Sequence, residues 1–211
     1  MPDTPDFSFE ATAIARGYLR VVGVDEVGRG PLCGPVLAAA VRLDPNHIPN
    51  GLNDSKKLSA AKRAALFELI IVNAEVAIGE ASVAEIDHLN ILRASHLAMS
   101  RAVGGLAVVP DHVLIDGNMI PRNFVPSAEA LVKGDARSLS IAAASIVAKV
   151  LRDRTMVDLA QQFPGYGWDR NAGYPTKEHL AALQNLGVTP HHRRSFKPVH
   201  NILCQAKTVS H

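Results

Sequence analysis

The chain has 211 residues, of which 47% are hydrophobic and 20% are charged, and its formal net charge is +2. This balance excludes a disordered or fibrous protein and fits one domain with a sizeable core. Apolar stretches are too short or too interrupted to span a bilayer, and no signal segment opens the sequence, so we expect no membrane partner and a cytoplasmic location. The two cysteines, Cys33 and Cys204, are expected to be reduced and indicate no zinc site.

Strand and helix patterns follow one another along the chain and predict an α/β fold. Branched apolar runs that end at glycine, proline or asparagine predict five strands, at residues 19–25, 36–43, 74–81, 113–116 and 130–132. Helical spacing and N-cap residues predict helices at residues 59–73, 85–103, 140–163 and 176–185. Short links make the first three strands antiparallel neighbours, whereas the fourth follows a helix, so we predict a mixed sheet with helices on both faces.

The predicted domain covers residues 18–200, and its carboxyl-terminal part, from about residue 164, is loop-rich and helical. Residues 1–17 and the tail 201–211 match no motif, so we assign them no role.

Two adjacent acids, Asp25 and Glu26, end the first predicted strand, which is rich in valine. An unpaired carboxylate in a buried strand loses several kcal/mol of hydration, so a positive partner is expected. The turn that follows, Gly28-Arg29-Gly30, lets a ligand approach the backbone and adds a fork of donors. Metal and phosphate are the candidate partners.

Two more acids lie at element boundaries: Asp116 ends the fourth strand, and Asp135 follows the fifth. If the first and fourth strands are neighbours, Asp25 and Asp116 converge, and Asp135 joins them from the approach to the next helix. Hard carboxylate oxygens suit Mg²⁺ or Mn²⁺. The alternative is a set of ordinary strand-end and turn aspartates.

Other site types do not fit these residues. Gly23 and Gly28 have the glycine spacing of a nucleotide P-loop, but Arg29-Gly30 replaces the required lysine and hydroxyl residue. A dinucleotide fingerprint that starts at Gly28 needs a third glycine where Cys33 stands. The histidines lack metal-helix spacing, and no serine nucleophile motif is present.

The carboxyl-terminal part carries an uneven charge. Residues 187–200 contain Arg193, Arg194 and Lys197 but no acid, which would suit a polyanion. A solvated loop around an anchoring Phe196 explains the same composition, and both interpretations remain open.

Six motifs follow one another along the chain: Gly23-Val24-Asp25-Glu26-Val27-Gly28-Arg29-Gly30-Pro31, Asn53-Asp54-Ser55-Lys56-Lys57-Leu58, Leu114-Ile115-Asp116-Gly117-Asn118, Lys133-Gly134-Asp135, Ala143-Ala144-Ser145-Ile146-Val147-Ala148-Lys149 and Gly173-Tyr174-Pro175-Thr176. Together they resemble the signatures of bacterial ribonuclease HII, from about residue 19 to residue 198. The resemblance implies a ribonuclease H-like fold with a helical carboxyl-terminal extension.

The resemblance also implies an activity. It is that of an endonuclease which hydrolyses the RNA strand of RNA–DNA hybrids. Such an enzyme also nicks duplex DNA on the 5′ side of single embedded ribonucleotides, leaving 3′-hydroxyl and 5′-phosphate ends, and so serves ribonucleotide removal. By position, the implied metal ligands and catalytic residues are Asp25, Glu26, Asp116 and Asp135, with two Mn²⁺ or Mg²⁺ ions per site. The turn Gly28-Arg29-Gly30 is implied to recognise the ribonucleotide, and Tyr174 to pack on the next sugar.

One position departs from the pattern. Some relatives place a glutamate five residues after the last aspartate, where this chain has Ser140. Because the four main acids are intact, we expect this change to affect metal affinity or preference rather than the reaction. As a residue of N-cap type, Ser140 could simply begin a helix.

Substrate binding is expected to combine charge and shape, in a monomer whose partners are RNA–DNA hybrids and ribonucleotide-containing duplexes. The candidate phosphate contacts are Lys56, Lys57, Lys149, Arg193 and Arg194. Ser145 shares a helix face with Lys149, four residues on, and is a further candidate contact. Backbone groups of Gly28-Arg29-Gly30 can read the 2′-hydroxyl that distinguishes RNA from DNA.

Two other functional classes remain as alternatives. A non-catalytic hybrid-binding module would explain the basic residues, but four acids would repel its phosphates unless metals intervene. A nucleotide-binding phosphatase or kinase-like protein would explain metals and glycines, but no complete phosphate loop is present.

Overall fold

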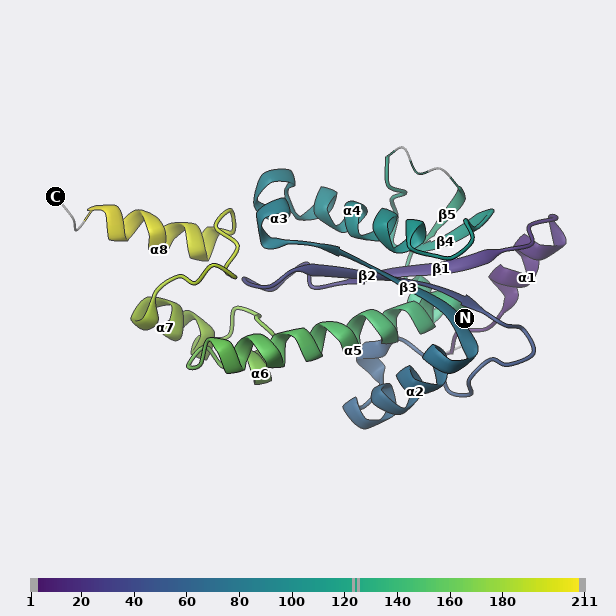
Figure 1. Cartoon of the computed structure of the whole chain (residues 1–211), viewed down its shortest axis with the longest axis horizontal. Helices are drawn as coiled ribbons and strands as arrows, with labels where there is room; N and C mark the ends of the chain where they lie inside the picture. The colour runs from purple at the N-terminus through teal and green to yellow at the C-terminus, as the bar shows by residue number, and fades with distance from the viewer. Residues whose placement is uncertain (1–3, 123, 125, 209–211) are drawn as a thin grey trace.

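The computed structural model describes residues 4–122, 124 and 126–208. No helix in these ranges has both the length and the apolar character needed to cross a bilayer. In Figure 1 a central sheet lies between two layers of helices, and the carboxyl-terminal helices extend from one end.

The sheet has five strands in the spatial order β3-β2-β1-β4-β5. They are β1 (Val21–Val27), β2 (Val36–Leu43), β3 (Ala74–Ala81), β4 (His112–Asp116) and β5 (Ser127–Leu131). The first three strands pair antiparallel, whereas β1, β4 and β5 run parallel. The predicted mixed sheet is confirmed, although β1 begins and ends two residues later than expected, β4 begins one residue earlier and β5 begins three residues earlier.

Eight α-helices and two short 3₁₀ helices make up the rest of the described regular structure. They are α1 (Ser8–Ala15), η1 (Ser55–Lys57), α2 (Ala60–Asn73), α3 (Val83–Leu89), α4 (Ile91–Gly104), η2 (Gly134–Ala136), α5 (Leu139–Gln162), α6 (Trp168–Asn171), α7 (Lys177–Leu186) and α8 (Lys197–Thr208). Figure 1 shows α3 and α4 on one face of the sheet and α2 and α5 on the other, as predicted.

Capping explains where several helices begin and end. The side chains of Ser59 and Thr176 accept from Lys62 N and His179 N, as expected for the N-caps of α2 and α7. The predicted helix 85–103 is instead two helices, because Asn90 has φ 71° and its side chain caps α4. Asparagine tolerates this left-handed region better than most residues.

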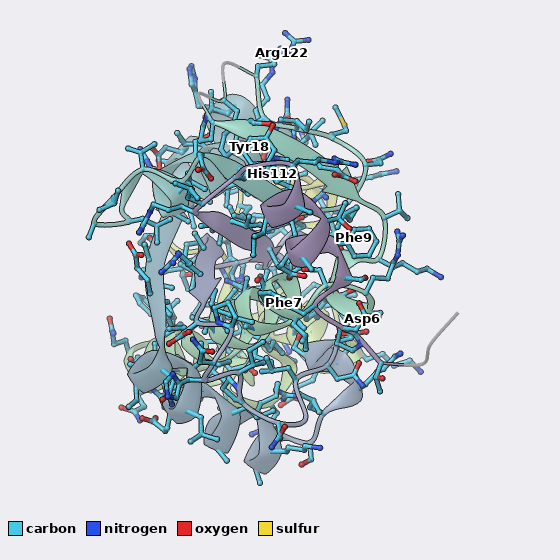
Figure 2. All side chains as sticks on the ribbon, turned by 90° about the vertical axis from the view of Figure 1, so that its right-hand side faces the viewer. Asp6, Phe7, Phe9, Tyr18, His112 and Arg122 are labelled. Carbon is cyan, nitrogen blue, oxygen red and sulfur yellow. The ribbon has the colours of Figure 1, made fainter. Side chains whose placement is uncertain are left out.

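The helices differ from the sequence analysis at three places. The N-cap of α5 is Ser138, which accepts from Ile141 N, whereas Ser140 lies inside the first turn. The boundary placed at residue 200 falls inside α8, and the unassigned amino-terminal segment forms α1. Figure 2 looks onto the end of the molecule that carries α1, where Asp6, Phe7 and Phe9 are labelled.

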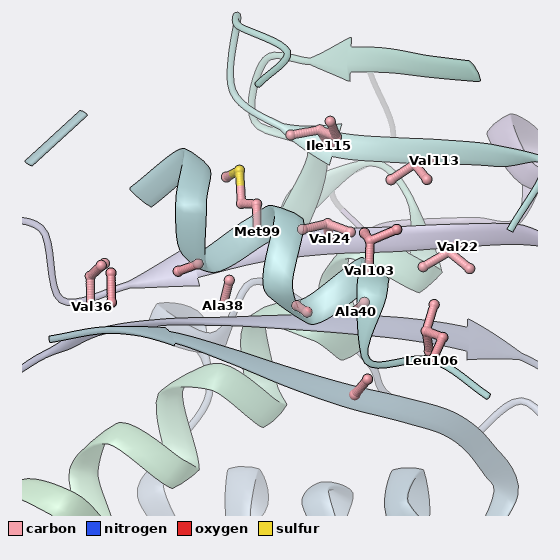
Figure 3. Close-up of a cluster of buried hydrophobic side chains, with 14 of the residues drawn as sticks. Val22, Val24, Val36, Ala38, Ala40, Met99, Val103, Leu106, Val113 and Ile115 are labelled. Carbon is pink, nitrogen blue, oxygen red and sulfur yellow. The ribbon is translucent and has the colours of Figure 1, made fainter. Parts of the chain in front are cut away.

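Hydrophobic side chains pack on both faces of the sheet. On one face, Val22 and Val24 of β1 lie with Val113 and Ile115 of β4 against α4 (Figure 3). Because side chains alternate along a strand, Gly23 and Asp25 point to the opposite face, toward α5. A Cβ at Gly23 would stand 2.2 Å from the Ser140 carbonyl carbon, so glycine allows the start of α5 to lie directly on β1. This contact sets where Asp25 meets the helix layer.

Candidate active site

The first acids of the site lie where two parallel strands stop pairing. Val24 of β1 pairs with Ile115 of β4, and the next residues are Asp25, still inside β1, and Asp116, the last residue of β4. The η2 turn brings in Asp135, and Gly134 N donates to Asp116 Oδ1 at 2.7 Å. The condition on which the convergence of these acids depended is met, because the first and fourth strands are neighbours in the sheet.

Burial and like charge dominate the electrostatics of the site. Asp25 is 7% exposed, and burial followed by the charges of Glu26, Asp116 and Asp135 holds the pKa of Asp25 well above its usual value. Burial also raises the pKa of Glu26, although the Arg29 guanidinium opposes that shift. Each of these acids therefore pays in free energy to be ionised in the folded chain.

The Asp135 carboxyl group shows that the cluster extends beyond the four predicted acids. Burial and the charges of Asp116 and Asp54 raise the pKa of Asp135 to about 6, against the opposing charge of Lys56. Asp54 caps η1 by accepting from Lys56 N at 2.9 Å. Asp54 lies in one of the six motifs, but the sequence alone indicated no role for it.

Lys56 is a cation that faces these acids. Its Nζ lies 4.0 Å from Asp135 Oδ2 on a side chain that is 80% exposed. Burial lowers the pKa of Lys56, but Asp25, Asp54, Asp135 and Asp116 together raise it above its usual value. One exposed lysine does not neutralise a cluster of this size.

The donor set fits divalent cations that also take ligands from outside the protein. Within the described residues, no three His, Cys, Asp or Glu side chains form a ready-made cage. Glu26 Oε2 is nevertheless buried and lacks a hydrogen-bond partner among those residues. Mg²⁺ and Mn²⁺ suit such carboxylates because they commonly complete their coordination with water and substrate phosphates.

The turn after β1 joins the acids to a glycine-lined surface. Arg29 Nη1 lies 3.2 Å from Glu26 Oε1. A Cβ at Gly30 would stand 3.2 Å from the Tyr174 ring, and that ring is on a residue 46% exposed. The structure therefore brings together Arg29, Gly30 and Tyr174, which are far apart in the sequence.

The prediction that Arg193 contacts phosphate was wrong. Arg193 is fully buried, and its five side-chain N–H groups donate to backbone carbonyls of one segment. The acceptors are the carbonyl oxygens of Gly28, Arg29, Pro31, Gly34 and Pro35. Composition showed a basic run but could not show that one of its members points inward to hold the ribonucleotide-reading turn expected from the motifs.

A second buried arginine supports the same segment from α5. Arg152 is 2% exposed and donates to the carbonyls of Pro35 and Cys33. A Cβ at Gly28, where φ is 98°, would stand 2.6 Å from Arg152 Nε. Only glycine fits both this conformation and this contact. No sequence motif indicated Arg152.

Two buried histidines hold the backbone of Tyr174. His179 Nδ1 lies 2.9 Å from Tyr174 O, and Trp168 Nε1 donates to His179 Nε2. His192 Nε2 lies 3.2 Å from His179 Nε2, while Thr189 N donates to His192 Nδ1. These hydrogen-bond partners fit neutral tautomers of both histidines. Burial lowers the pKa of both rings, and the pKa of His192 falls to about 4.

The remaining predicted contacts occupy different environments. Lys57 and Arg194 are exposed, whereas Lys149 Nζ pairs with Asp153 Oδ1 at 2.7 Å. Ser145 is 3% exposed; its hydroxyl donates to Ala142 O and accepts from Ser55 N. The hydroxyl thus anchors η1 to α5, and the expected substrate contact by Ser145 has no support in this geometry.

We predict that Asp135→Asn stabilises the metal-free protein. Because folding raises this pKa from its ordinary 3.8 to about 6, the destabilisation is fully present above pH 6 and disappears as the pH falls toward 4. With a chelator at about pH 7.5, the Tm should rise by roughly 2–4 °C per kcal/mol of repulsion removed. Circular dichroism at this pH and at about pH 4 measures the effect.

The exposed Asp158 on the same chain serves as the control, since Asp158→Asn should change stability by less than about 0.5 kcal/mol. A lower Tm for Asp135→Asn near neutral pH would contradict the repulsion.

We also predict that Arg193→Ala destabilises the fold by about 3 kcal/mol or more, because it leaves buried carbonyls without donors. Arg193→Lys should recover little of the lost stability, since an ammonium group lacks the planar fork of five donors. Denaturant unfolding compares both with Arg194→Ala, whose parent residue is exposed. Equal stabilities for the two alanine variants would refute the inward role.

Comparison with known proteins agrees with the geometry. Residues 22–199 match the sequence model of the family described as Ribonuclease HII. A ribonuclease HII of Ruegeria pomeroyi is 70% identical over 95% of this chain and 86% of its own length. One of Cereibacter sphaeroides is 66% identical over 98% of this chain and 97% of its own.

A solved structure shows the same fold. The crystal structure of ribonuclease H2 from Pyrococcus horikoshii matches with a TM-score of 0.77 at 27% identity, over 90% of this chain and 99% of that one. With acids, glycine turn and tyrosine placed as described, these likenesses lead to one conclusion: the chain belongs to the ribonuclease HII family.

Proposed function

We propose that this ribonuclease nicks duplex DNA on the 5′ side of single embedded ribonucleotides, leaving 3′-hydroxyl and 5′-phosphate ends. Membership of the family makes it a ribonuclease H enzyme that acts on RNA–DNA hybrids. The finer activity, with a role in ribonucleotide removal by a monomer, is our proposal. The observation that carries it is the cluster of buried, mutually repelling carboxylates beside the glycine turn and Tyr174.

In this proposal Asp25, Glu26, Asp116 and Asp135 hold two Mg²⁺ or Mn²⁺ ions. Asp25 and Asp116, at the adjacent strand ends, would be shared, while Glu26 and Asp135 would each complete one ion. When bound, such ions lower the pKa of an attacking water and stabilise the leaving 3′ oxygen. The protein supplies the fixed positions of the acids, and no histidine base is required.

The turn Gly28-Arg29-Gly30 is proposed to read the ribonucleotide. The buried Arg193 guanidinium donates to the carbonyls of Gly28 and Arg29 from the interior of the protein, so these carbonyls already have a partner. The turn is therefore left with its N–H groups to offer to a 2′-hydroxyl oxygen. The neighbouring Tyr174 ring would pack on the following sugar.

Phosphate contacts are proposed for Lys56, Lys57, Lys149 and Arg194, which act through charge and carry no sequence information. Lys56 is the best placed of these because it already lies near Asp135. A binding module without catalysis would gain nothing from the acids that this lysine faces.

We predict that Asp116→Asn abolishes nicking while the fold is retained. The reason is that Asn cannot supply the negative charge of a shared ligand. The rate on a duplex with one ribonucleotide is measured with Mg²⁺ and with Mn²⁺, and a chelator should stop the wild type. Asp158→Asn is the matched control. Full activity of the Asp116 variant would overturn the site, and tight binding without cleavage by the wild type would indicate the binding module.

We predict that Tyr174→Phe loses only modest activity, because the ring face is kept. Tyr174→Ala should lose a stacking contact worth about 1–3 kcal/mol. The rate is measured on the single-ribonucleotide duplex and on an all-deoxy duplex, beside the Tm of each variant. Equal losses for the two variants, or normal cutting by Tyr174→Ala, would exclude a stacking role.

A further inference from the structure

The amino-terminal segment is attached to the turn that carries Asp135. Asp6 forms a parallel bridge with Ser138: Asp6 N donates to Arg137 O at 3.2 Å, and Leu139 N donates to Asp6 O at 3.1 Å. The Arg137 guanidinium also lies over the Phe9 ring, 4.7 Å from its centroid. In Figure 2 Asp6, Phe7 and Phe9 lie at the end of the molecule formed by α1.

Glu10 makes the most specific contact of this segment. It is 1% exposed, and its Oε1 accepts from the Ser138 hydroxyl at 2.6 Å and from Ser140 N at 2.8 Å. A carboxylate at the first turn of a helix satisfies an N–H that has no partner within the helix and interacts favourably with the helix dipole. Glu10 therefore fixes the start of α5 from a segment about 130 residues earlier.

Hydrogen bonds continue from Glu10 to the acid cluster. Ser138 N donates to Gly134 O at 2.8 Å, and Gly134 N donates to Asp116 Oδ1 at 2.7 Å. The η2 turn is thus held by a carboxylate on each side, Asp116 at the strand end and Glu10 through Ser138. Asp135 is the residue between these two attachments.

Starting α5 does not explain the buried charge. Ser138 already caps the helix through Ile141 N, and burial of a carboxylate costs several kcal/mol unless its bonds offset that cost. The additional consequence of Glu10 is that the Ser138 side chain, and with it the adjoining η2 turn, has one fixed orientation.

We propose that Glu10 is a positioning residue of the active site, which acts through Ser138 to aim Asp135 at Asp25 and Asp116. The inference rests on the proposed function, because it treats Asp135 as a metal ligand. Groups that orient metal ligands typically contribute 10–100-fold to metal affinity or activity. The amino-terminal helix is accordingly part of the catalytic unit.

The test is direct binding of Mn²⁺ to the free protein, followed by calorimetry, together with kcat and KM for nicking. Glu10→Ala should weaken Mn²⁺ binding by roughly tenfold or more and lower kcat, with KM for the duplex unchanged. Glu10→Gln keeps the shape of the side chain, but hydrogen bonds to a neutral amide are about half as strong as those to a carboxylate. The Mn²⁺ affinity of this variant should therefore lie between those of the wild type and Glu10→Ala. Thr12→Ala, on the exposed side of α1, is the matched control and should bind Mn²⁺ as the wild type does.

The outcomes separate this inference from the function on which it rests. Wild-type Mn²⁺ affinity in folded Glu10→Ala would overturn the positioning role. Should that variant not fold, wild-type affinity in Glu10→Gln would overturn it instead. Asp135→Asn is titrated in parallel: unchanged Mn²⁺ binding there would refute the proposed metal site itself, whereas lost binding there beside an unaffected Glu10 variant would refute only the role of Glu10.

Discussion

Repulsion between buried carboxylates is the interaction to which the rest of this structure responds. Burial first, and then the charges of neighbouring acids, favour the protonated form of these groups and raise the pKa of Asp135, and the same charges would drive a looser chain apart. Strand pairing prevents the first response, because β1 and β4 are locked in register by their backbones. Burial of Val22 and Val24 on the far face then holds the strand ends in place from behind.

The buried positive charges do not pair with the buried acids. Arg152 and Arg193 are buried, yet they bond to backbone carbonyls rather than to the acids. Their charge is used to shape the chain between β1 and β2 rather than to neutralise Asp25 or Glu26. As a result neither buried arginine neutralises the acid cluster, and both hold the glycine turn beside it.

The sequence predicted the parts of the site that local chemistry determines. A valine-rich strand ending in Asp25 and Glu26 indicates both the strand and the need for a cation, and the matching end of β4 follows from the sheet topology. Burial that depends on contacts between distant segments could not be predicted from the sequence. Arg193 and Arg194 are adjacent residues of the same type, and only the fold turns Arg193 inward. The break at Asn90 depends on a single positive φ that helical spacing conceals.

The amino-terminal helix was missed for a related reason. Its apolar residues are spread around the helix rather than gathered on one face, so periodicity gives no signal. What stabilises α1 is tertiary: Ala13 packs with Leu114 and Ile141, and Glu10 bonds to Ser138. Asp54 escaped notice similarly, since its proximity to Asp135 arises from segments about 80 residues apart.

A single helix, α5, connects the two halves of the site. It begins beside the acids, where Ser140 lies on Gly23, and twelve residues after Ser140 it places Arg152 against Gly28. At 1.5 Å per residue this is a rod of roughly 20 Å, with a rotation of about 100° for each residue. One inserted residue would rotate Arg152 by about 100° away from Gly28, so the spacing between the acid cluster and the glycine turn cannot change in small steps.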